Sequence, residues 1–254
     1  MHCGSSPDLN NVLIGRDAEE ACRRAAQVFI DAAHESIASC GRFTVSLSGG
    51  STPKRLYSLL AQPEWASRID WTKVHIFWGD ERVVSPDDEK SNYRMTRETL
   101  LSRINIPAEN VHRVMVETGT PEEVAAAYEA KVRDVLAPKP TDVARFDLVL
   151  LGLGTNGHTA SLFPYQPTLR VDDKLVVADM VQEVGTYRIS MTAKLLNDAA
   201  VAMFLVTGDE KADVLHEVLK GKHDPEKLPA QLIQPVCGML LWVVDEAAAA
   251  KLHR

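Results

Sequence analysis

The chain has 254 residues, a formal net charge of −7, and 45% hydrophobic and 25% charged residues, which excludes a fibrous or disordered protein. The negative charge, with no Lys/Arg-rich run, argues against a general nucleic-acid partner. No apolar stretch approaches the ~20 residues that span a bilayer and no secretory signal opens the sequence, so we expect a protein of the cytoplasm without a membrane partner.

Patterns of strand and helix alternate from the first third of the chain onward. Residues 17–38 are expected to form a helix, because small and apolar side chains recur at helical spacing from Ala21 to Ala32. The segment RFTVSLS has the β-branched and apolar content of a strand. It ends at the glycine turn GGSTP, after which we expect a helix that opens at Pro53.

The same alternation continues to the end of the chain. We expect further strands at KVHIFW, FDLVLLGLG, RISMT, VAMFLVTG and MLLWVVD, and helices over residues 92–101, 121–136, 193–199, 209–220 and 246–254. Short apolar strands that alternate with helices are typical of a mostly parallel sheet covered on both faces. We therefore predict one α/β domain over residues 1–254, a three-layer αβα arrangement around a Rossmann-like open sheet.

Three distinctive segments follow predicted strands: SGGSTP, WGDER and GLGTNGH. In an open parallel sheet, ligands bind in the crevice beyond the carboxyl ends of the strands. The three segments are therefore expected on one rim of the sheet.

The first segment offers Gly49 and Gly50 for a close approach of the backbone to a ligand, with the hydroxyl groups of Ser51 and Thr52 beside a helix N-terminus. Free N–H groups and the helix dipole make such a place suitable for a phosphate. A purely structural turn with a helix cap is an equally good interpretation of this segment alone.

The second segment places Asp80, Glu81 and Arg82 directly after a strand. An isolated charged triplet is most often a solvated turn in which the arginine pairs with a carboxylate, but its place on the rim favours a role in ligand binding. Ser91 or Asn92 further along is a candidate cap of the following helix.

The third segment matches the pattern G-x-G-x-x-G through Gly152, Gly154 and Gly157. A dinucleotide site also needs an acidic residue at the end of a strand ~20 residues further on. The acidic residues near that distance, Asp172 and Asp173, lie in the polar segment RVDDK instead. We therefore predict that no nicotinamide cofactor binds here.

His158 is the candidate proton-transfer group of this segment, because an imidazole with a pKa near ~6.5 can accept a proton at neutral pH. A lone histidine is more often a surface or structural residue. Arg188 and Lys211 are two further cations at the ends of predicted elements, and Lys211 stands at a helix start, where a bound anion would compensate it. The four cysteines are scattered without metal-ligand spacing, so we expect reduced thiols and no metal site.

Together these segments resemble the 6-phosphogluconolactonase family, whose fold relatives include glucosamine-6-phosphate deaminase. The resemblance rests on SLSGGSTPKRLY, FWGDERVVSPDDEKSNYRMTRETLL, DLVLLGLGTNGHTASLFP, RISMTAKLLNDA, LVTGDEKADVL and LPAQLIQP, which occur in family order over most of the chain.

The resemblance implies metal-independent and cofactor-independent hydrolysis of 6-phospho-D-glucono-1,5-lactone to 6-phosphogluconate, in the oxidative pentose phosphate pathway. It assigns the phosphate to the loop of Gly50, Ser51 and Thr52 with Arg188 and Lys211. Proton transfer would fall to His158, contact with the sugar or its carbonyl to Arg82, and orientation of the histidine or of substrate hydroxyls to Asp80. Gly49, Asn156 and Gly157 would also line the substrate site.

Asn156 departs from the family pattern, in which many members have Asp at this position. An amide cannot act as a base, so Asn156 disfavours the deaminase reaction more than lactone hydrolysis. An amino-sugar phosphate isomerase or deaminase, and a sugar-phosphate sensor without turnover, remain the alternative hypotheses. A monomer and a homodimer are both compatible with the sequence.

Overall fold

The computed structural model describes residues 11–137, 139, 143–182 and 185–252. Its main sheet contains six strands in the order β1-β9-β8-β5-β2-β3, and every neighbouring pair is parallel. The strands are β1 (Val12–Gly15), β2 (Phe43–Leu47), β3 (Val74–Trp78), β5 (Leu148–Leu151), β8 (Val201–Val206) and β9 (Met239–Asp245). The predicted mostly parallel α/β sheet is confirmed.

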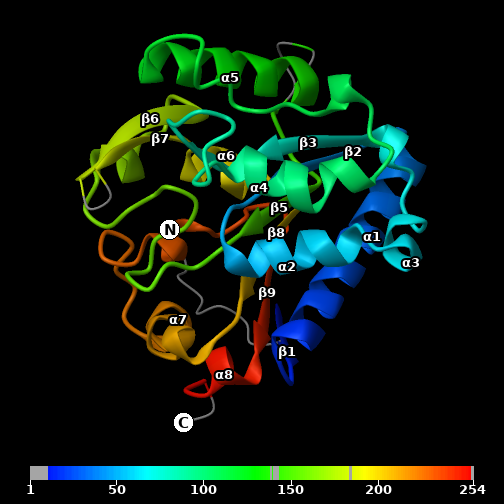
Figure 1. The fold of residues 1–254 in the computed structure, drawn as a ribbon. Helices are drawn as coiled ribbons and strands as arrows, with labels where there is room; N and C mark the ends of the chain where they lie inside the picture. The colour runs from blue at the N-terminus through cyan, green and yellow to red at the C-terminus, as the bar shows by residue number, and fades with distance from the viewer. Residues whose placement is uncertain (1–10, 138, 140–142, 183–184, 253–254) are drawn as a thin grey trace.

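Helices cover both faces of this sheet (Figure 1). They are α1 (Ala18–Cys40), α2 (Ser51–Leu60), α3 (Pro63–Ala66), α4 (Asn92–Thr99), α5 (Pro121–Leu136), α6 (Ala193–Asn197), α7 (Ala212–Lys220) and α8 (Glu246–Ala249). Asp17 caps α1 by accepting a hydrogen bond from the N–H of Glu20, and Thr120 begins α5 with a reciprocal capping box to Glu123.

Alternating side chains of the strands pack into two hydrophobic clusters. Along β8, Met203 and Leu205 join α1 and α2 in one cluster, whereas Phe204 and Val206 join α5, α6, α7 and α8 in the other. Because successive side chains of a strand point to opposite faces of the sheet, one cluster lies on each face. The strands are therefore buried on both sides, and their sequences are almost continuously apolar.

A second, antiparallel sheet has the order β4-β7-β6 and consists of Asp80–Arg82, Thr186–Met191 and Val176–Val181. Figure 1 shows α5 lying across β6 and β7. RISMT forms a strand as predicted, but it lies in this second sheet, where it pairs with β6 and with the charged triplet. That triplet is itself a strand and not only a turn. The strands β1 and β6 were not predicted from the sequence.

The helix after the first glycine turn begins at Ser51, two residues before the predicted Pro53. Proline is tolerated at this third position because the first N–H groups of a helix have no partner within it. No helix within the described residues is long and apolar enough to cross a membrane. Of the four cysteines, Cys3 lies outside the described residues, and Cys22, Cys40 and Cys237 are free thiols.

Candidate active site

The order of the main sheet reverses between β2 and β5. From β2 the chain continues to β3 at one edge, while β5, β8 and β9 add strands toward the other edge. Ligands of open α/β sheets bind at the carboxyl end of such a switch point. A cavity of about 600 Å³ lies there, and it collects most of the predicted site residues: Gly49, Gly50, Asp80, Arg82, Asn156, His158, Arg188 and Lys211.

Ser51 and Thr52 line a neighbouring cavity of about 370 Å³, which shares Gly49, Gly50 and Lys211 with the first. The backbone N–H groups of residues 49–52 donate no hydrogen bond to any described residue. These N–H groups at the start of α2 and the neighbouring lysine have the chemistry suited to an anion. The Thr52 hydroxyl is already within hydrogen-bond distance of the Thr207 hydroxyl, at 2.9 Å.

Two tyrosines brace the backbone at the strand ends that border the site. The hydroxyl of Tyr57 on α2 accepts a hydrogen bond from the N–H of Ser48 and donates one to its carbonyl oxygen. The hydroxyl of Tyr128 on α5 does the same for Trp78 at the end of β3. Each fully paired hydroxyl fixes a residue just before a site segment, and neither tyrosine was predicted to do so.

Glu81 ties the charged strand β4 to the start of α4. Its buried carboxylate accepts hydrogen bonds from the N–H groups of Arg82, Asn92 and Tyr93, each at 2.8 Å, and from the hydroxyl of Ser91. Burial raises the pKa of this carboxyl group. Ser91 is the helix cap, as the sequence suggested. The spacing between GDER and SNY therefore has a structural cause: one carboxylate joins the two segments.

Asp80 is nearly buried at the cavity wall and is held by two side chains. Its Oδ2 accepts a hydrogen bond of 2.7 Å from the hydroxyl of Ser161, and its main-chain oxygen accepts one of 2.9 Å from Nδ2 of Asn92. The side-chain oxygen of Asn92 lies where a Cβ on Gly49 would stand, at 2.0 Å. A side chain at position 49 would therefore displace Asn92, so packing alone calls for a glycine there.

Arg82 and Arg188 are directly opposite one another in the antiparallel register of β4 and β7. Neither forms a salt bridge with a described carboxylate: Arg82 donates to the carbonyl oxygen of Lys90, and Arg188 to the hydroxyl of Thr186. Burial and the charge of Arg82 lower the pKa of Arg188. Like charges opposite each other in a sheet destabilise it, so an anion in this cavity would relieve the repulsion.

His158 is held through its Nδ1 atom, which lies 2.6 Å from Oδ1 of Asn156. The backbone N–H of His158 donates to the same Oδ1 atom at 3.2 Å, which identifies that atom as an acceptor. Nδ1 therefore carries the proton, and Nε2, which has no hydrogen-bond partner among the described residues, keeps its lone pair. The Asn156 side chain thus orients the histidine.

The electrostatic surroundings keep this imidazole neutral. Burial is the main reason that the pKa of His158 is lowered to about 4. The charge of Asp80 opposes this shift, and the charges of Lys211, Arg188 and Arg82 add to it. The cations that disfavour the protonated imidazole are those that an anionic ligand would neutralise. A phosphate in the cavity would therefore raise the pKa of His158 toward its ordinary value.

The loop that carries His158 is supported from the late segment LPAQLIQP. Gly157 has φ of 84°, and a Cβ there would stand 2.6 Å from the side chain of Leu228. Its carbonyl oxygen accepts a hydrogen bond from the N–H of Ala230. Gly157 is not among the residues that line either of the two cavities, and these contacts give it a role in shaping the loop. Ala160, at the cavity wall, also has a positive φ of 48°.

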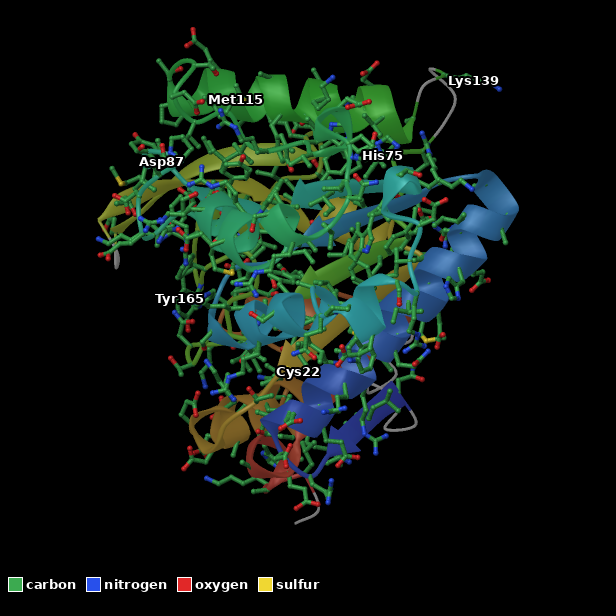
Figure 2. All side chains as sticks on the ribbon, turned by 45° about the vertical axis from the view of Figure 1, so that its right-hand side comes forward. Cys22, His75, Asp87, Met115, Lys139 and Tyr165 are labelled. Atoms are coloured by element: carbon green, nitrogen blue, oxygen red, sulfur yellow. The ribbon has the colours of Figure 1, made fainter. Side chains whose placement is uncertain are left out.

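A larger cavity of about 810 Å³ lies between α4 and α5 and contains none of the predicted site residues. Met115 on its rim lies close to α5 in Figure 2. Its wall includes His112, whose pKa burial lowers to about 4. The charged side chains Arg97, Arg113 and Lys131 in its wall already pair with carboxylates. Within the described residues there is no group of three or more side chains suited to hold a metal ion.

The family model for glucosamine-6-phosphate isomerases/6-phosphogluconolactonase matches residues 16–242. The chain belongs to this family. A 6-phosphogluconolactonase of Nostoc sp. is 41% identical to it over 229 residues, which are 90% of this chain and 92% of that relative. The resemblance to the 6-phosphogluconolactonase family drawn from the sequence motifs is confirmed.

Solved structures of the same family share the whole architecture. The 6-phosphogluconolactonase from Trypanosoma cruzi superposes with a TM-score of 0.85 at 27% identity and covers 100% of both chains. A monomeric glucosamine-6-phosphate deaminase reaches a TM-score of 0.81 at 19% identity, covering 95% of this chain and 99% of its own. At that identity the likeness to the deaminase concerns the fold alone.

Proposed function

We propose that this protein hydrolyses 6-phospho-D-glucono-1,5-lactone to 6-phospho-D-gluconate, in the oxidative pentose phosphate pathway. Its family membership and its relatives named 6-phosphogluconolactonase support lactone hydrolysis. The observation that carries the assignment in the site is the orientation of His158: Nδ1 is bonded to Asn156, and Nε2 is left as an acceptor beside three cations.

In the proposed mechanism, Nε2 of His158 takes a proton from a water molecule as its oxygen attacks C1 of the lactone. The bond between C1 and the ring oxygen then breaks, and the imidazolium returns the proton to that oxygen, so that the products are a carboxylic acid and a hydroxyl group. Arg82 stabilises the negative charge that develops on the carbonyl oxygen.

The substrate phosphate is assigned to the N–H groups of residues 50–52 at the start of α2, with Lys211 and Arg188. These groups lie away from the reacting carbon, and their binding energy orients the lactone against His158. Neutralising the two cations also raises the basicity of the imidazole, so the bound substrate prepares its own general base. Asp80, held by Ser161, faces the same cavity and is assigned to the sugar hydroxyls.

Deamination of an amino-sugar phosphate is the alternative enzymatic function. The amide of Asn156 is hydrogen-bonded to His158 and provides no carboxylate at this position, which favours hydrolysis over deamination. A sensor without turnover is the non-enzymatic alternative.

One comparison separates the three functions: hydrolysis of freshly made 6-phosphogluconolactone above its spontaneous rate, beside ammonia release from glucosamine 6-phosphate. Lactone hydrolysis alone supports the proposal. Ammonia release without lactonase activity contradicts it, as does binding of both compounds without turnover.

A further inference from the structure

Phe163 is a buried aromatic residue that fills neither hydrophobic core. Only 6% of it is exposed, yet it belongs to neither of the two hydrophobic clusters, and it is the one buried Phe, Tyr or Trp among the described residues for which this holds. Two residues further on, Tyr165 is 69% exposed and projects from the surface (Figure 2). The burial of Phe163 near the surface therefore needs a cause other than core packing.

One face of Phe163 packs against the imidazole of His158. The two rings stack, with centroids 4.2 Å apart and planes inclined by 17°. Phe163 also lines the cavity that contains the other site residues. An aromatic ring against the imidazole keeps water from one of its faces and restricts its rotation.

The backbone of Gly154 forms another wall against the same ring. A Cβ on Gly154 would stand 2.0 Å from Nδ1 and 2.1 Å from Cε1 of His158, a separation that no side chain tolerates. The absence of a side chain at Gly154 is what lets the imidazole lie in its position. Gly152, two residues earlier in the loop, has open space around the corresponding point.

We propose that Phe163 is a positioning residue, which together with Gly154 clamps the His158 imidazole so that Nε2 alone is presented to the cavity. Asn156 completes the clamp at Nδ1. The catalytic consequence rests on the proposed lactone hydrolysis, whereas the clamp concerns an imidazole and can be measured without substrate.

The charges that face His158 come from three other elements: Asp80 and Arg82 on β4, Arg188 on β7, and Lys211 before α7. None of them changes when Phe163 is replaced. A change in the titration of His158 in a Phe163 variant therefore reports on burial and orientation, and not on the surrounding charge.

The test compares two pairs of matched variants by NMR of the histidine ring nitrogens in the full chain. In Phe163→Leu and Gly154→Ala, we expect the pKa of His158 to rise from about 4 by about one unit or more toward its ordinary value, and a population of the tautomer protonated at Nε2 to appear. In their controls, Phe204→Leu in the core and Gly152→Ala in the same loop, both quantities should stay at the wild-type values.

Stability gives a second, independent readout. Phe204 stacks on Trp242 within a core cluster, so Phe204→Leu should lower the unfolding temperature more than Phe163→Leu does. If Gly154→Ala does not fold, Phe163→Leu decides the question alone. An unchanged tautomer and pKa of His158 in Phe163→Leu overturns the clamp.

Activity assays keep this inference apart from the proposed function. In Phe163→Leu we expect kcat for the lactone to fall about tenfold or more, because the base is held less often in its reactive orientation. NMR changes in a protein that does not hydrolyse the lactone would leave the clamp standing and refute the proposed function. If the protein hydrolyses the lactone but the tautomer and pKa of His158 are unchanged in Phe163→Leu and Gly154→Ala, the proposed function stands and the clamp is refuted.

Discussion

Replacing Asn156 by aspartate should convert the neutral partner of His158 into a charged one with little change in shape. A carboxylate would then stand where an amide oxygen lies 2.6 Å from Nδ1. The charge of a protonated His158 is spread over its ring, so its effective separation from the new carboxylate is ~4 Å. At an effective dielectric constant of ~20, the two charges then attract each other by about 4 kcal/mol. At about 1.4 kcal/mol per pKa unit this is about 3 units, and burial of the new carboxylate reduces it to roughly 2.

The pKa of His158 in Asn156→Asp should therefore rise from about 4 to the neighbourhood of ~6. A general base must be unprotonated, so the acidic limb of the kcat/KM profile for the lactone should move upward by about 2 pH units. The assay is initial rate from pH 4 to 8 after subtraction of spontaneous hydrolysis. Gln234→Glu adds the same charge at an exposed position outside the cavity and serves as the control. An unmoved acidic limb in Asn156→Asp would refute the pairing of His158 with Asn156 or its role as base.

Three further results are expected. His158→Ala should lower kcat by at least ~100-fold while the lactone still binds, and near-native kcat would end its assignment as base. Lys211→Ala should mainly raise KM, and an unchanged KM would remove it from the phosphate site. Because His158 titrates near 4 in the folded chain and near ~6.5 when unfolded, the unfolded state binds the extra proton as pH falls. The contribution of His158 to the free energy of unfolding should thus fall by about 2 kcal/mol between pH 7 and 5. The total drop over this range, measured by urea denaturation, should be smaller by about that amount in His158→Ala.

The main sheet could be predicted because its strands carry a strong local signal. Segments such as FDLVLL and VAMFLV are apolar on both faces, and only burial on both faces accounts for that pattern. The smaller sheet has no such signal: Asp80–Arg82 is charged, and its strand character comes from pairing with a segment more than a hundred residues away. Non-local pairing of a polar segment leaves no periodicity in the sequence.

The sequence predicted most residues of the candidate site but few of the contacts between them. The sequence singled out the glycines of GLGTNGH by their spacing, but it did not indicate what packs against them. The His158 ring lies against Gly154, and the Leu228 side chain lies against Gly157. Phe163, Ser161 and Asn92 were missed as contributors to the site, since each belongs to a residue type whose commonest place is a core, a turn or a helix cap. A signal existed for Asn92, which follows the acidic segment GDER at a helix start, where a carboxylate is favourable. Ser161 and Phe163 lie within the segment DLVLLGLGTNGHTASLFP, on which the family resemblance rests.

The contacts of His158 show what an exchange of Asp for Asn at position 156 keeps and what it changes. A carboxylate and an amide oxygen both accept the Nδ1 proton and both fix Nε2 as the free nitrogen, so orientation survives the exchange. What the exchange removes is charge, and the three cations around the cavity then act on His158 with only Asp80 against them. Burial and these charges together make the imidazole a weak base. The proposed substrate phosphate would offset the charges of the cations and so strengthen the base.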